Sequence, residues 1–536
     1  MEARSSPSGA WIRLVVPIVS TAASAILCGL AFPPTGWKFL AWVGVAPFLV
    51  AVRFSSLGRA LLLACVWTLL FWSMLWRWGP AAVSTYFLQS KVVGVAFLLG
   101  TAILMFVPYH VAFTAAYRAL SSRVGASLPL LAAAAWAAAE LARGRLFTGT
   151  SFFIGNPWGL LGYSQVGFDP VMQIASVTGI YGVSFLLIAV NAAVADFSTE
   201  LWQQRPQPRR ATAGLGLALL VVAGALAFGY AALRAAPAQE TASSAVRTAI
   251  VQANLGSTSR WRSDLYGRNL DTYLRLTRET LAARDPGMVF WPESAMTFFL
   301  EREPGYRWAI GKVLSANGAE LIAGAPRAVG PGEPNYFNSI YLISGEGVVL
   351  ARYDKEYLLP FAEFFPFRKV DLLRRRFGPI RQFSAGEPAP PLPTRAGPAG
   401  IAVCNEVMFP EIVGRRVAQG AAYLVNPSND SWVPDLQFAM HQFHIASARA
   451  VEQRRYLVRT STSGPSAIVD PWGRVQVRTE PFERDVIVGT IRPNSELSVY
   501  GRVGDLFGLL CGISVLAALM TGYARRKPSP RSQASR

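Results

Sequence analysis

Charged residues are scarce in this chain of 536 amino acids. Asp, Glu, Lys and Arg together make up 15% of it, against 52% for the hydrophobic types, whereas an average soluble protein carries about 25% charged residues. This deficit argues against an ordinary soluble protein and points to a lipid bilayer. The chain is also too long for a single ordinary domain.

Acidic residues are few relative to basic ones, which gives a net charge of +19. Such a balance can serve nucleic-acid binding, but that function also calls for a basic stripe with interleaved aromatic residues, which the sequence lacks. In a membrane protein Lys and Arg collect in short cytoplasmic loops, which accounts for the same excess. We therefore expect no nucleic-acid partner.

Cysteine and histidine are rarer still. Of the four cysteines, Cys28, Cys65 and Cys511 lie in long apolar runs, where Cys is most simply a small buried hydrophobe. Cys404 alone lies in a polar segment, so no disulfide can form within that segment. There is no CxxC pair, and the three histidines lack metal-ligand spacing. The sequence therefore predicts no metal site and no cofactor.

Apolar runs, by contrast, are abundant. Crossing a bilayer takes roughly 20 apolar residues, and the candidate runs are 14–32, 38–53, 58–76, 92–119, 127–142, 172–196, 211–233 and 505–523, of which the second and fifth are short. The sequence predicts a membrane α-helical bundle of about eight transmembrane helices, with about seven in residues 1–233 and the last at 505–523.

The placement of Lys and Arg around these runs predicts their orientation. With a cytoplasmic amino terminus, fourteen basic residues lie inside: Arg4, Arg13, Arg53, Arg59, Arg118, Arg123, Arg205, Arg209, Arg210, Arg525, Arg526, Lys527, Arg531 and Arg536. Five lie in short outer loops: Lys38, Arg77, Lys91, Arg143 and Arg145. The polar segment 244–496 is then outside the cytoplasm, and residues 524–536 form a basic cytoplasmic tail.

The polar segment alternates strand-like and helical stretches, which indicates an α/β layered domain. Helices are expected at Leu265–Arg284 and His441–Gln453, and Ser384–Gly400, with five prolines, is expected to be a loop. The expected strands are Arg247–Gln252, Gly287–Trp291, Glu320–Gly324, Ser339–Ser344, Gly400–Cys404, Ala422–Asn426, Tyr456–Ser461 and Val486–Ile491.

Three apolar runs in this segment end on residues with reactive side chains: Glu293, Lys355 and Cys404. The carboxyl ends of strands are where α/β domains place their sites. A thiol needs a base to become a nucleophilic thiolate, and a cation can hold the oxyanion that its attack creates. Each residue also has an ordinary interpretation: a packed Cys, a turn Glu or a solvated Lys.

The surrounding motifs favour the reactive interpretation. Trp-Pro-Glu-Ser around Glu293, Tyr-Asp-Lys at Lys355 with the downstream Leu359–Pro366, and Val-Cys-Asn-Glu around Cys404 resemble the carbon–nitrogen hydrolase (nitrilase) superfamily. The resemblance implies an α-β-β-α sandwich with a Glu-Lys-Cys triad. The spacings fit, since Lys355 lies 62 residues after Glu293 and Cys404 lies 49 after Lys355.

The apolar half of the chain indicates which family within this superfamily the sequence resembles. Such a domain between about seven spans and one span is similar to the apolipoprotein N-acyltransferase family, as are Glu140–Gly144, Phe147–Gly149, Asn156–Trp158, Gly162–Gln165 and Gly179–Phe185 with Asn191. The resemblance implies a multi-pass protein of the bacterial inner membrane with a periplasmic catalytic domain. The acyl donor would be a membrane phospholipid and the acceptor a diacylglyceryl apolipoprotein. A monomer is expected.

By this resemblance Glu293 is the general base, Lys355 the oxyanion stabiliser and Cys404 the nucleophile. The supporting residues it implies are Glu363, Glu406, Trp261 and Asn338, and the candidate lipid or substrate contacts are Trp158, Tyr163 and Asn405. Trp and Tyr at a bilayer interface are equally often mere anchors.

One departure concerns Asn405, since many members of this family have an aromatic residue directly after the nucleophile. This departure puts in doubt the lipid contact at that position, but not the triad. Two other functions stay open at this point. A membrane-tethered amidase would have a dispensable membrane half and a water-open pocket, and a transporter or receptor with a dead nitrilase-like domain would have lost triad residues.

Overall fold

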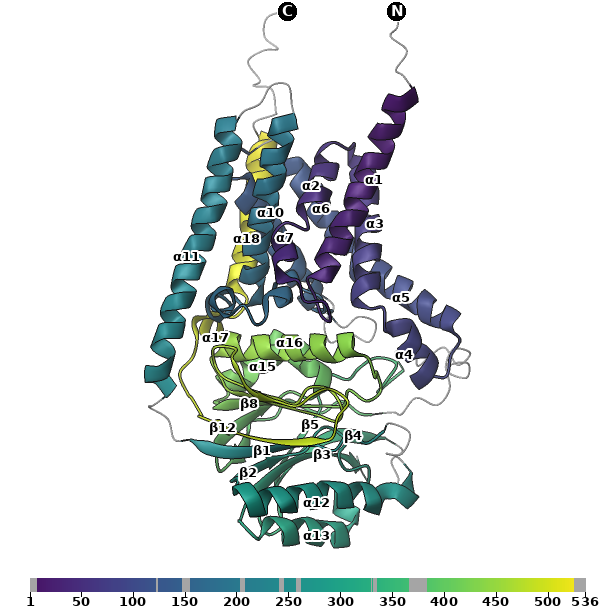
Figure 1. Cartoon of the computed structure of the whole chain (residues 1–536), viewed down its shortest axis with the longest axis vertical. Helices are drawn as coiled ribbons and strands as arrows, with labels where there is room; N and C mark the ends of the chain where they lie inside the picture. Colours follow the sequence, from purple (N-terminus) through teal and green to yellow (C-terminus); the bar gives the residue numbers. More distant parts are fainter. Residues whose placement is uncertain are drawn as a thin grey trace, which may run out of the picture.

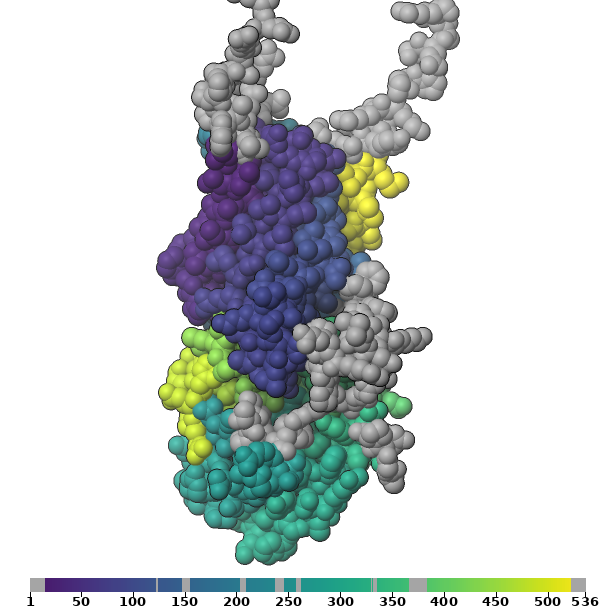
Figure 2. Space-filling model, turned by 90° about the vertical axis from the view of Figure 1, so that its right-hand side faces the viewer, coloured from purple at the N-terminus to yellow at the C-terminus, as the bar shows by residue number. Residues whose placement is uncertain are grey.

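The computed structural model contains a helical bundle and an α/β part stacked end to end (Figure 1). It describes residues 7–121, 124–146, 155–202, 208–240, 245–256, 262–328, 330, 335–365 and 383–524. Figure 2, turned by 90°, shows the same stacking, with the purple and blue helical segments above the green and teal α/β segments. Helix α1 begins, and helix α18 ends, at the pole of the bundle that points away from the α/β part.

The long helices of the bundle come from both ends of the chain. They are α1 (Pro7–Leu30), α3 (Leu57–Leu75), α5 (Lys91–Met105), α6 (Val107–Ser121), α7 (Leu128–Arg145), α10 (Ile180–Trp202), α11 (Pro208–Glu240) and α18 (Leu506–Ala524). Shorter helices are η1 (Lys38–Trp42), α2 (Ala46–Arg53), α4 (Gly79–Tyr86), η2 (Leu161–Gln165), α8 (Asp169–Met172), α9 (Ala175–Thr178) and α17 (Val499–Val503).

Three described helical segments are long and apolar enough to cross a membrane: Leu57–Leu75, Ile180–Trp202 and Arg209–Ala236. A fourth span results if α5 and α6, which meet at a bend of 40°, are counted as one. Val15–Leu30 and Leu506–Thr521 are apolar but shorter. The expected number of about eight spans therefore stays a prediction.

The expectation that 38–53 forms one continuous spanning helix is wrong. It forms the five-residue η1, a turn, and α2, which has eight residues. At 1.5 Å per residue such a helix covers about 12 Å, well short of the roughly 30 Å hydrocarbon core. The expected span 172–196 likewise begins later, because Gly179, with φ of 66°, interrupts the helical path before α10.

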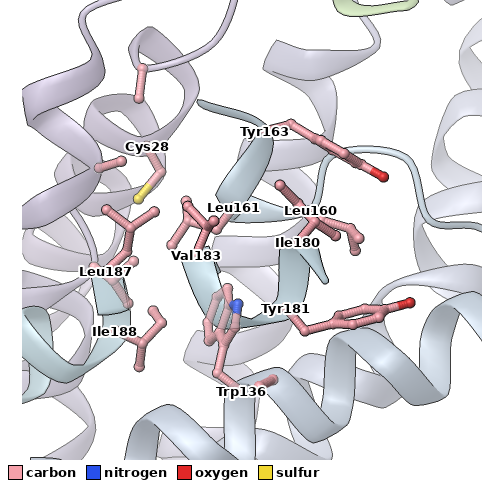
Figure 3. Packing of buried hydrophobic residues seen from close by; sticks show 14 of the residues in the cluster. Cys28, Trp136, Leu160, Leu161, Tyr163, Ile180, Tyr181, Val183, Leu187 and Ile188 are labelled. Atoms are coloured by element: carbon pink, nitrogen blue, oxygen red, sulfur yellow. The ribbon is translucent and has the colours of Figure 1, made fainter. Parts of the chain in front are cut away.

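Small residues and a few polar side chains hold the bundle together. Cys28 is fully buried, as its apolar run predicts, and belongs with Val183 and Leu187 of α10 to one cluster of buried hydrophobic residues (Figure 3). Asn191 of α10 makes polar links to the α1–α2 connection. Its Oδ1 accepts from the backbone N–H groups of Val45 (2.7 Å) and Ala46 (2.9 Å), and its Nδ2 donates to a backbone carbonyl of η1 at 2.8 Å. Such bonds matter in lipid because no water can replace them.

Two six-stranded sheets face each other in the α/β part. The first has the order β12-β1-β2-β3-β4-β5 and the second β11-β10-β9-β8-β7-β6. The strands are β1 (Val246–Gln252), β2 (Met288–Phe290), β3 (Glu320–Ala328), β4 (Tyr336–Ile343), β5 (Val349–Asp354), β6 (Leu392–Thr394), β7 (Gly397–Ile401), β8 (Tyr423–Ser428), β9 (Leu457–Ser461), β10 (Ala467–Val469), β11 (Val475–Arg478) and β12 (Asp485–Ile491).

Helices cover the outer face of each sheet, which gives the four layers of an α-β-β-α sandwich (Figure 1). Helices α12 (Tyr266–Arg284) and α13 (Pro304–Leu314) cover the first sheet, and α15 (Pro410–Ala418) and α16 (Leu436–Gln453) the second. One apolar core joins the two sheets through residues such as Phe290 and Val425. A second core lies under α12 and α13, while the core under α16 continues without a break into the bundle.

The expected strands and the two expected helices are all present with shifted ends. The expected loop Ser384–Gly400 is wrong in part, because β6 and the start of β7 form a hairpin there whose Leu392 and Ala399 pair. Proline is compatible with such an edge strand, which needs fewer ladder donors. Trp261, the motif Phe147–Gly149 and all of the expected tail beyond residue 524 lie outside the described residues.

We expect Asn191→Leu to destabilise the bundle. The change leaves the buried backbone N–H group of Val45 without an acceptor, at a cost of about 1–3 kcal/mol, whereas the N–H group of Ala46 keeps the carbonyl of Val43 at 3.2 Å. The measurement is thermal unfolding of the purified protein in detergent, with Thr521→Val as the control because that exposed hydroxyl bonds only to its own helix. Equal unfolding temperatures for the two variants would show that the Asn191 links contribute no stability.

Candidate active site

Three strand ends meet at one edge of the sandwich. Glu293 follows β2, and Lys355 follows β5, which runs in the same direction as β2 because β3–β4 and β4–β5 are both antiparallel pairs. Cys404 follows β7, the parallel partner of β8. Because the two sheets face each other, the carboxylate, the ammonium group and the thiol lie in one buried cluster, although the three residues span 112 positions of the chain.

Cys404 sits on a sharp turn rather than at the end of a strand. Its φ of 49° lies in the left-handed region, which costs a non-glycine residue on the order of 1–3 kcal/mol, and strain of this kind is often concentrated at active sites. The residue opens η5 (Cys404–Met408), and Asn426 Nδ2 donates to its carbonyl at 3.2 Å. A strained turn between a strand and a helix is a common way to present a nucleophile.

Lys355 lies between two carboxylates. Its side chain is 2% exposed, and its Nζ is 2.8 Å from Glu363 Oε2 and 3.7 Å from Glu293 Oε1. Asn338 of β4 joins the same two acids, because its Nδ2 donates to Glu293 Oε1 at 2.6 Å and to Glu363 Oε1 at 2.8 Å. The partners keep Lys355 charged despite its burial and raise its pKa.

Glu293 keeps one carboxylate oxygen available. Oε1 is held by Asn338 and faces Lys355, whereas Oε2 is buried and accepts no hydrogen bond of normal geometry from the described residues. The Cys404 thiol is close enough to act on this carboxyl as a hydrogen-bond donor. Glu293 is therefore placed to take a proton from the thiol.

Glu406 fastens the Lys355 loop to the Cys404 turn. Its Oε1 accepts from the backbone N–H groups of Glu356 (2.7 Å) and Tyr357 (2.9 Å), and its Oε2 accepts from that of Val403 (2.7 Å). Tyr353 donates to the same carboxylate at 2.9 Å. Glu406 thus fixes the position of Lys355 relative to Cys404 by binding residues adjacent to each. None of these hydrogen bonds involves the Lys355 or Cys404 side chain itself.

Charge and burial set the protonation of the cluster at rest. Burial first and then the Glu293 carboxylate raise the pKa of Cys404 to about 12, while Lys355 lowers it. Burial also raises the pKa of Glu293, against the opposing pull of Lys355. The resting cluster therefore holds a neutral thiol. Moving its proton to Glu293 creates no additional net charge in the buried site, which makes the transfer easier than loss of the proton to water.

A second polar chain behind the thiol was not predicted from the sequence. Ser428 Oγ lies 3.6 Å from Cys404 Sγ and 2.6 Å from Asp430 Oδ1, and Arg459 donates to Asp430 Oδ2 at 2.7 Å. The signal that could have revealed it is the buried arginine inside the apolar strand β9, since an unpaired buried charge is costly. These hydrogen bonds hold the Ser428 hydroxyl beside the Cys404 sulfur.

The residues expected to contact lipid or substrate lie in two places. Asn405 follows the nucleophile, is 4% exposed, and donates to the carbonyl of Tyr357 at 3.2 Å. Trp158 and Tyr163 are buried where the bundle meets α16: the Trp158 ring lies 4.4 Å from that of His441, and the Tyr163 hydroxyl accepts from Arg449 at 2.8 Å. Their burial argues against simple anchors in bulk lipid.

Among the described residues, no group of three or more His, Cys, Asp or Glu side chains is arranged to hold a metal ion.

We expect the electrostatics of the site to appear in the alkylation of Cys404 by iodoacetamide. Because the thiol pKa is about 12, the rate should rise steadily with pH up to about that value, without a plateau near neutrality. Glu293→Gln removes a neighbouring negative charge and should speed alkylation at pH 9 by about 3–10-fold, whereas Lys355→Met should slow it by a similar factor.

Peptide mapping would follow Cys404 separately from the other cysteines, with Lys312→Met as the control because that lysine is exposed on α13. Slower alkylation in Glu293→Gln than in the parent protein would mean that Glu293 acts on the thiol mainly as a base rather than as a repelling charge.

Comparison with known families accounts for both parts of the chain. Residues 24–193 match the apolipoprotein N-acyltransferase N-terminal domain, and residues 247–498 match the carbon-nitrogen hydrolase family. Among solved structures, the nitrilase-superfamily protein Nit3 of Saccharomyces cerevisiae is 18% identical and covers 46% of this chain and 90% of its own, with a TM-score of 0.35. An amidase from Nesterenkonia is 21% identical, covering 47% and 91%, with a TM-score of 0.35.

Several relatives that match most of the chain carry the same name. Apolipoprotein N-acyltransferase of Geobacter metallireducens is 31% identical over 503 residues, 92% of this chain and 94% of its own. The protein of that name from Pseudomonas aeruginosa is 31% identical over 72% of this chain and 73% of its own, and that from Gloeobacter violaceus 27% identical over 97% and 96%. With a relative above 30% identity over nearly its whole length and both halves matched, the chain belongs to the apolipoprotein N-acyltransferase family.

Proposed function

We propose that this enzyme transfers a fatty acyl chain from a membrane phospholipid to the α-amino group of a diacylglyceryl-cysteine lipoprotein, in two steps through Cys404. The observation that carries the proposal is the buried cluster itself. A thiol on a strained turn lies beside a carboxylate with one unpartnered oxygen, and a lysine with a fixed charge lies on the other side of that carboxylate.

In the first step Glu293 takes the thiol proton and the Cys404 sulfur attacks the ester carbonyl of the phospholipid. Lys355 stabilises the oxyanion of the tetrahedral intermediate, an interaction typically worth about 2.7–4 kcal/mol of barrier. When the intermediate collapses, the ester C–O bond breaks and the protonated Glu293 returns its proton to the leaving alkoxide. A lysophospholipid departs and the acyl chain stays on Cys404 as a thioester.

In the second step the free α-amine of the acceptor attacks the thioester carbonyl. Lys355 again faces the oxyanion, and Glu293 takes a proton from the attacking nitrogen. The C–S bond then breaks, the sulfur regains a proton from Glu293, and the amide product leaves. The burial of Cys404, which is 5% exposed, supports this route over hydrolysis because water has little access to the thioester.

The supporting residues have different roles in this proposal. Glu363 and Asn338 are positioning residues that hold Lys355 and Glu293 in register, and Glu406 positions the turn that carries Cys404. Trp158 and Tyr163, buried where the bundle meets α16, and Asn405, next to the nucleophile, are the proposed substrate contacts, and Trp261 belongs to the same site by family resemblance.

We further infer the placement of the parts. Residues 1–233 form a transmembrane bundle of about seven helices, 244–496 the catalytic domain, 505–523 the last span and 524–536 a cytoplasmic tail. Two features support a position in the inner membrane with the domain on the periplasmic side. The α/β part lies at one end of the apolar helices, and in the sequence the segments expected on the cytoplasmic side carry most of the Lys and Arg that flank the apolar runs. A monomer is the simplest state consistent with a cluster supplied entirely by one chain.

The rival amidase activity has weaker support. It requires a water-open pocket and a membrane half that can be dispensed with, but the apolar core of the bundle continues without a break under α16 into the domain. The solved amidase is similar only in part of the chain.

The direct test is mass spectrometry of the purified protein in phospholipid. We expect a mass increase of one acyl chain that maps to Cys404, is absent in Cys404→Ala, and disappears when a diacylated lipopeptide with a free α-amine is added. Cys511→Ala, a buried cysteine of α18, should keep the adduct. A folded protein that carries no adduct, but hydrolyses small amides, would replace the acyltransferase with the amidase.

Gly324 offers a test of how tightly Glu293 must be placed. A Cβ at this position would lie 2.6 Å from the backbone nitrogen of Ser294 and 2.8 Å from Glu293 Cα. Gly324→Ala should therefore displace the carboxylate and lower the transfer rate by about 100-fold, the effect of a misplacement of about 1 Å. Gly305→Ala, where a Cβ meets open space, should leave the rate unchanged. An unimpaired Gly324→Ala enzyme would contradict a requirement for fixed geometry at Glu293.

A further inference from the structure

An open hollow of about 400 Å³ lies apart from the Cys404 cluster. Its lining comes from two short stretches, the α1–α2 connection and the chain around the end of η2. The lining residues are Gly36, Trp37, Lys38, Phe39, Trp42, Gln165 and Phe168. None of them belongs to the polar contacts described around Cys404, Lys355 and Glu293, so this is a separate feature of the surface.

Hydrogen bonds across the hollow give it a fixed shape. Gln165 Nε2 donates to the backbone carbonyl of Lys38 at 3.0 Å, and Trp42 Nε1 donates to Gln165 Oε1 at 3.0 Å. Gln165 is fully buried, so its amide ties the two walls together from behind. The lining is therefore built by the fold and does not depend on exposed side chains alone.

Lys38 supplies the charge of the hollow. No carboxylate oxygen of the described residues lies within ion-pairing distance of its Nζ, although Asp169 is near enough to attract it. Gly167, with φ of 82°, passes so close that a Cβ there would lie 2.7 Å from Nζ. The absence of a side chain at Gly167 leaves room for the ammonium group, which retains donors for a ligand.

Aromatic rings form the rim. Trp37 is 52% exposed, Phe39 65% and Phe168 37%, which is high for side chains of this size. Helix α1 ends just before this connection, at the end of the bundle that faces the α/β part (Figure 1). A cation ringed by exposed aromatics at the end of apolar helices combines the two features that recognise a phospholipid, a phosphate and the apolar chains beside it.

We propose that this hollow binds one anionic phospholipid, with the phosphate on Lys38 and the glycerol and upper acyl chains against Trp37, Phe39 and Phe168. A volume of about 400 Å³ holds a headgroup and the first part of the chains, within the usual size of ligand sites, while the rest of the lipid stays in the bilayer. The site is a binding site without chemistry, and it does not depend on the proposed acyl transfer.

Helix α16 gives the site a connection to the rest of the enzyme. It packs against η2, which ends at Gln165, and also against η5, which begins at Cys404. The hollow and the turn that bears Cys404 therefore both adjoin elements packed on α16, and a lipid held at Lys38 would keep the α/β part close to the bilayer surface.

The test uses native mass spectrometry of the full chain with Cys404→Ala, which cannot form the thioester and so separates binding from turnover. Delipidated protein is titrated with phosphatidylglycerol and, in parallel, with phosphatidylcholine of the same chains. We expect one saturable phosphatidylglycerol whose affinity falls about fivefold when Lys38→Gln is added, which is the contribution of one interfacial lysine. Lys91→Gln, which removes an exposed lysine of the same bundle, should bind like the parent.

Phe39→Ser is the second variant and should weaken both lipids, since it removes apolar contact and leaves the charge. Glycerol phosphate at millimolar concentration should fail to displace the lipid. Displacement by glycerol phosphate would identify a simple anion site and overturn the lipid assignment. Equal binding by the Lys38→Gln and Lys91→Gln proteins would also overturn the proposal, because the aromatic rim would then act only as a nonspecific membrane anchor. Absence of acyl transfer by the protein with Cys404 intact, while Cys404→Ala still binds the lipid, would reject the proposed function and leave this site intact.

Discussion

A buried lysine with two carboxylate partners is the constraint on which the catalytic cluster depends. An ammonium group that is 2% exposed must be paired, because an isolated buried charge is very costly. Glu363 supplies the close pair at 2.8 Å and Glu293 the more distant one at 3.7 Å. Because Glu363 balances most of the charge of Lys355, Glu293 is free to exchange a proton with Cys404 without leaving an unpaired cation.

The same requirement for paired buried charges also links the α/β part to the bundle. Helix α16 is buried on both faces, by the second sheet and by the bundle, and carries Arg449 and Glu452 as a buried pair at 2.9 Å. Glu452 accepts from the first backbone N–H of α10 at 2.8 Å, and Arg449 reaches Tyr163. These links cross between the two parts, so the turn that bears Cys404 rests on a layer fixed by the bundle.

Sequence patterns predicted eight of the twelve described strands, because apolar runs stop abruptly at residues such as Glu293 and Cys404, but they missed β5, β6, β10 and β11. They could not give the contacts that depend on tertiary pairing. Asp430 and Ser428 meet Cys404 only through the pairing of β7, β8 and β9, and Asn338 joins Glu293 and Glu363 across three strands. The eight-span count had the same weakness: an apolar run such as 38–53 fixes composition, but whether it is one helix depends on turns and on polar partners such as Asn191.

Burial of the thiol favours the acyl-enzyme over the free thiolate. The surroundings that raise the pKa of Cys404 to about 12 do so by disfavouring its charged form. A thioester has no such charge to desolvate, so acylation removes the group that the site tolerates least. In the second step, when the amine displaces the sulfur, the leaving group is the disfavoured thiolate unless the sulfur receives a proton as the C–S bond breaks. In the mechanism proposed above, Glu293, protonated by the attacking amine, would deliver that proton, which would tie release of the product to the arrival of the correct nucleophile.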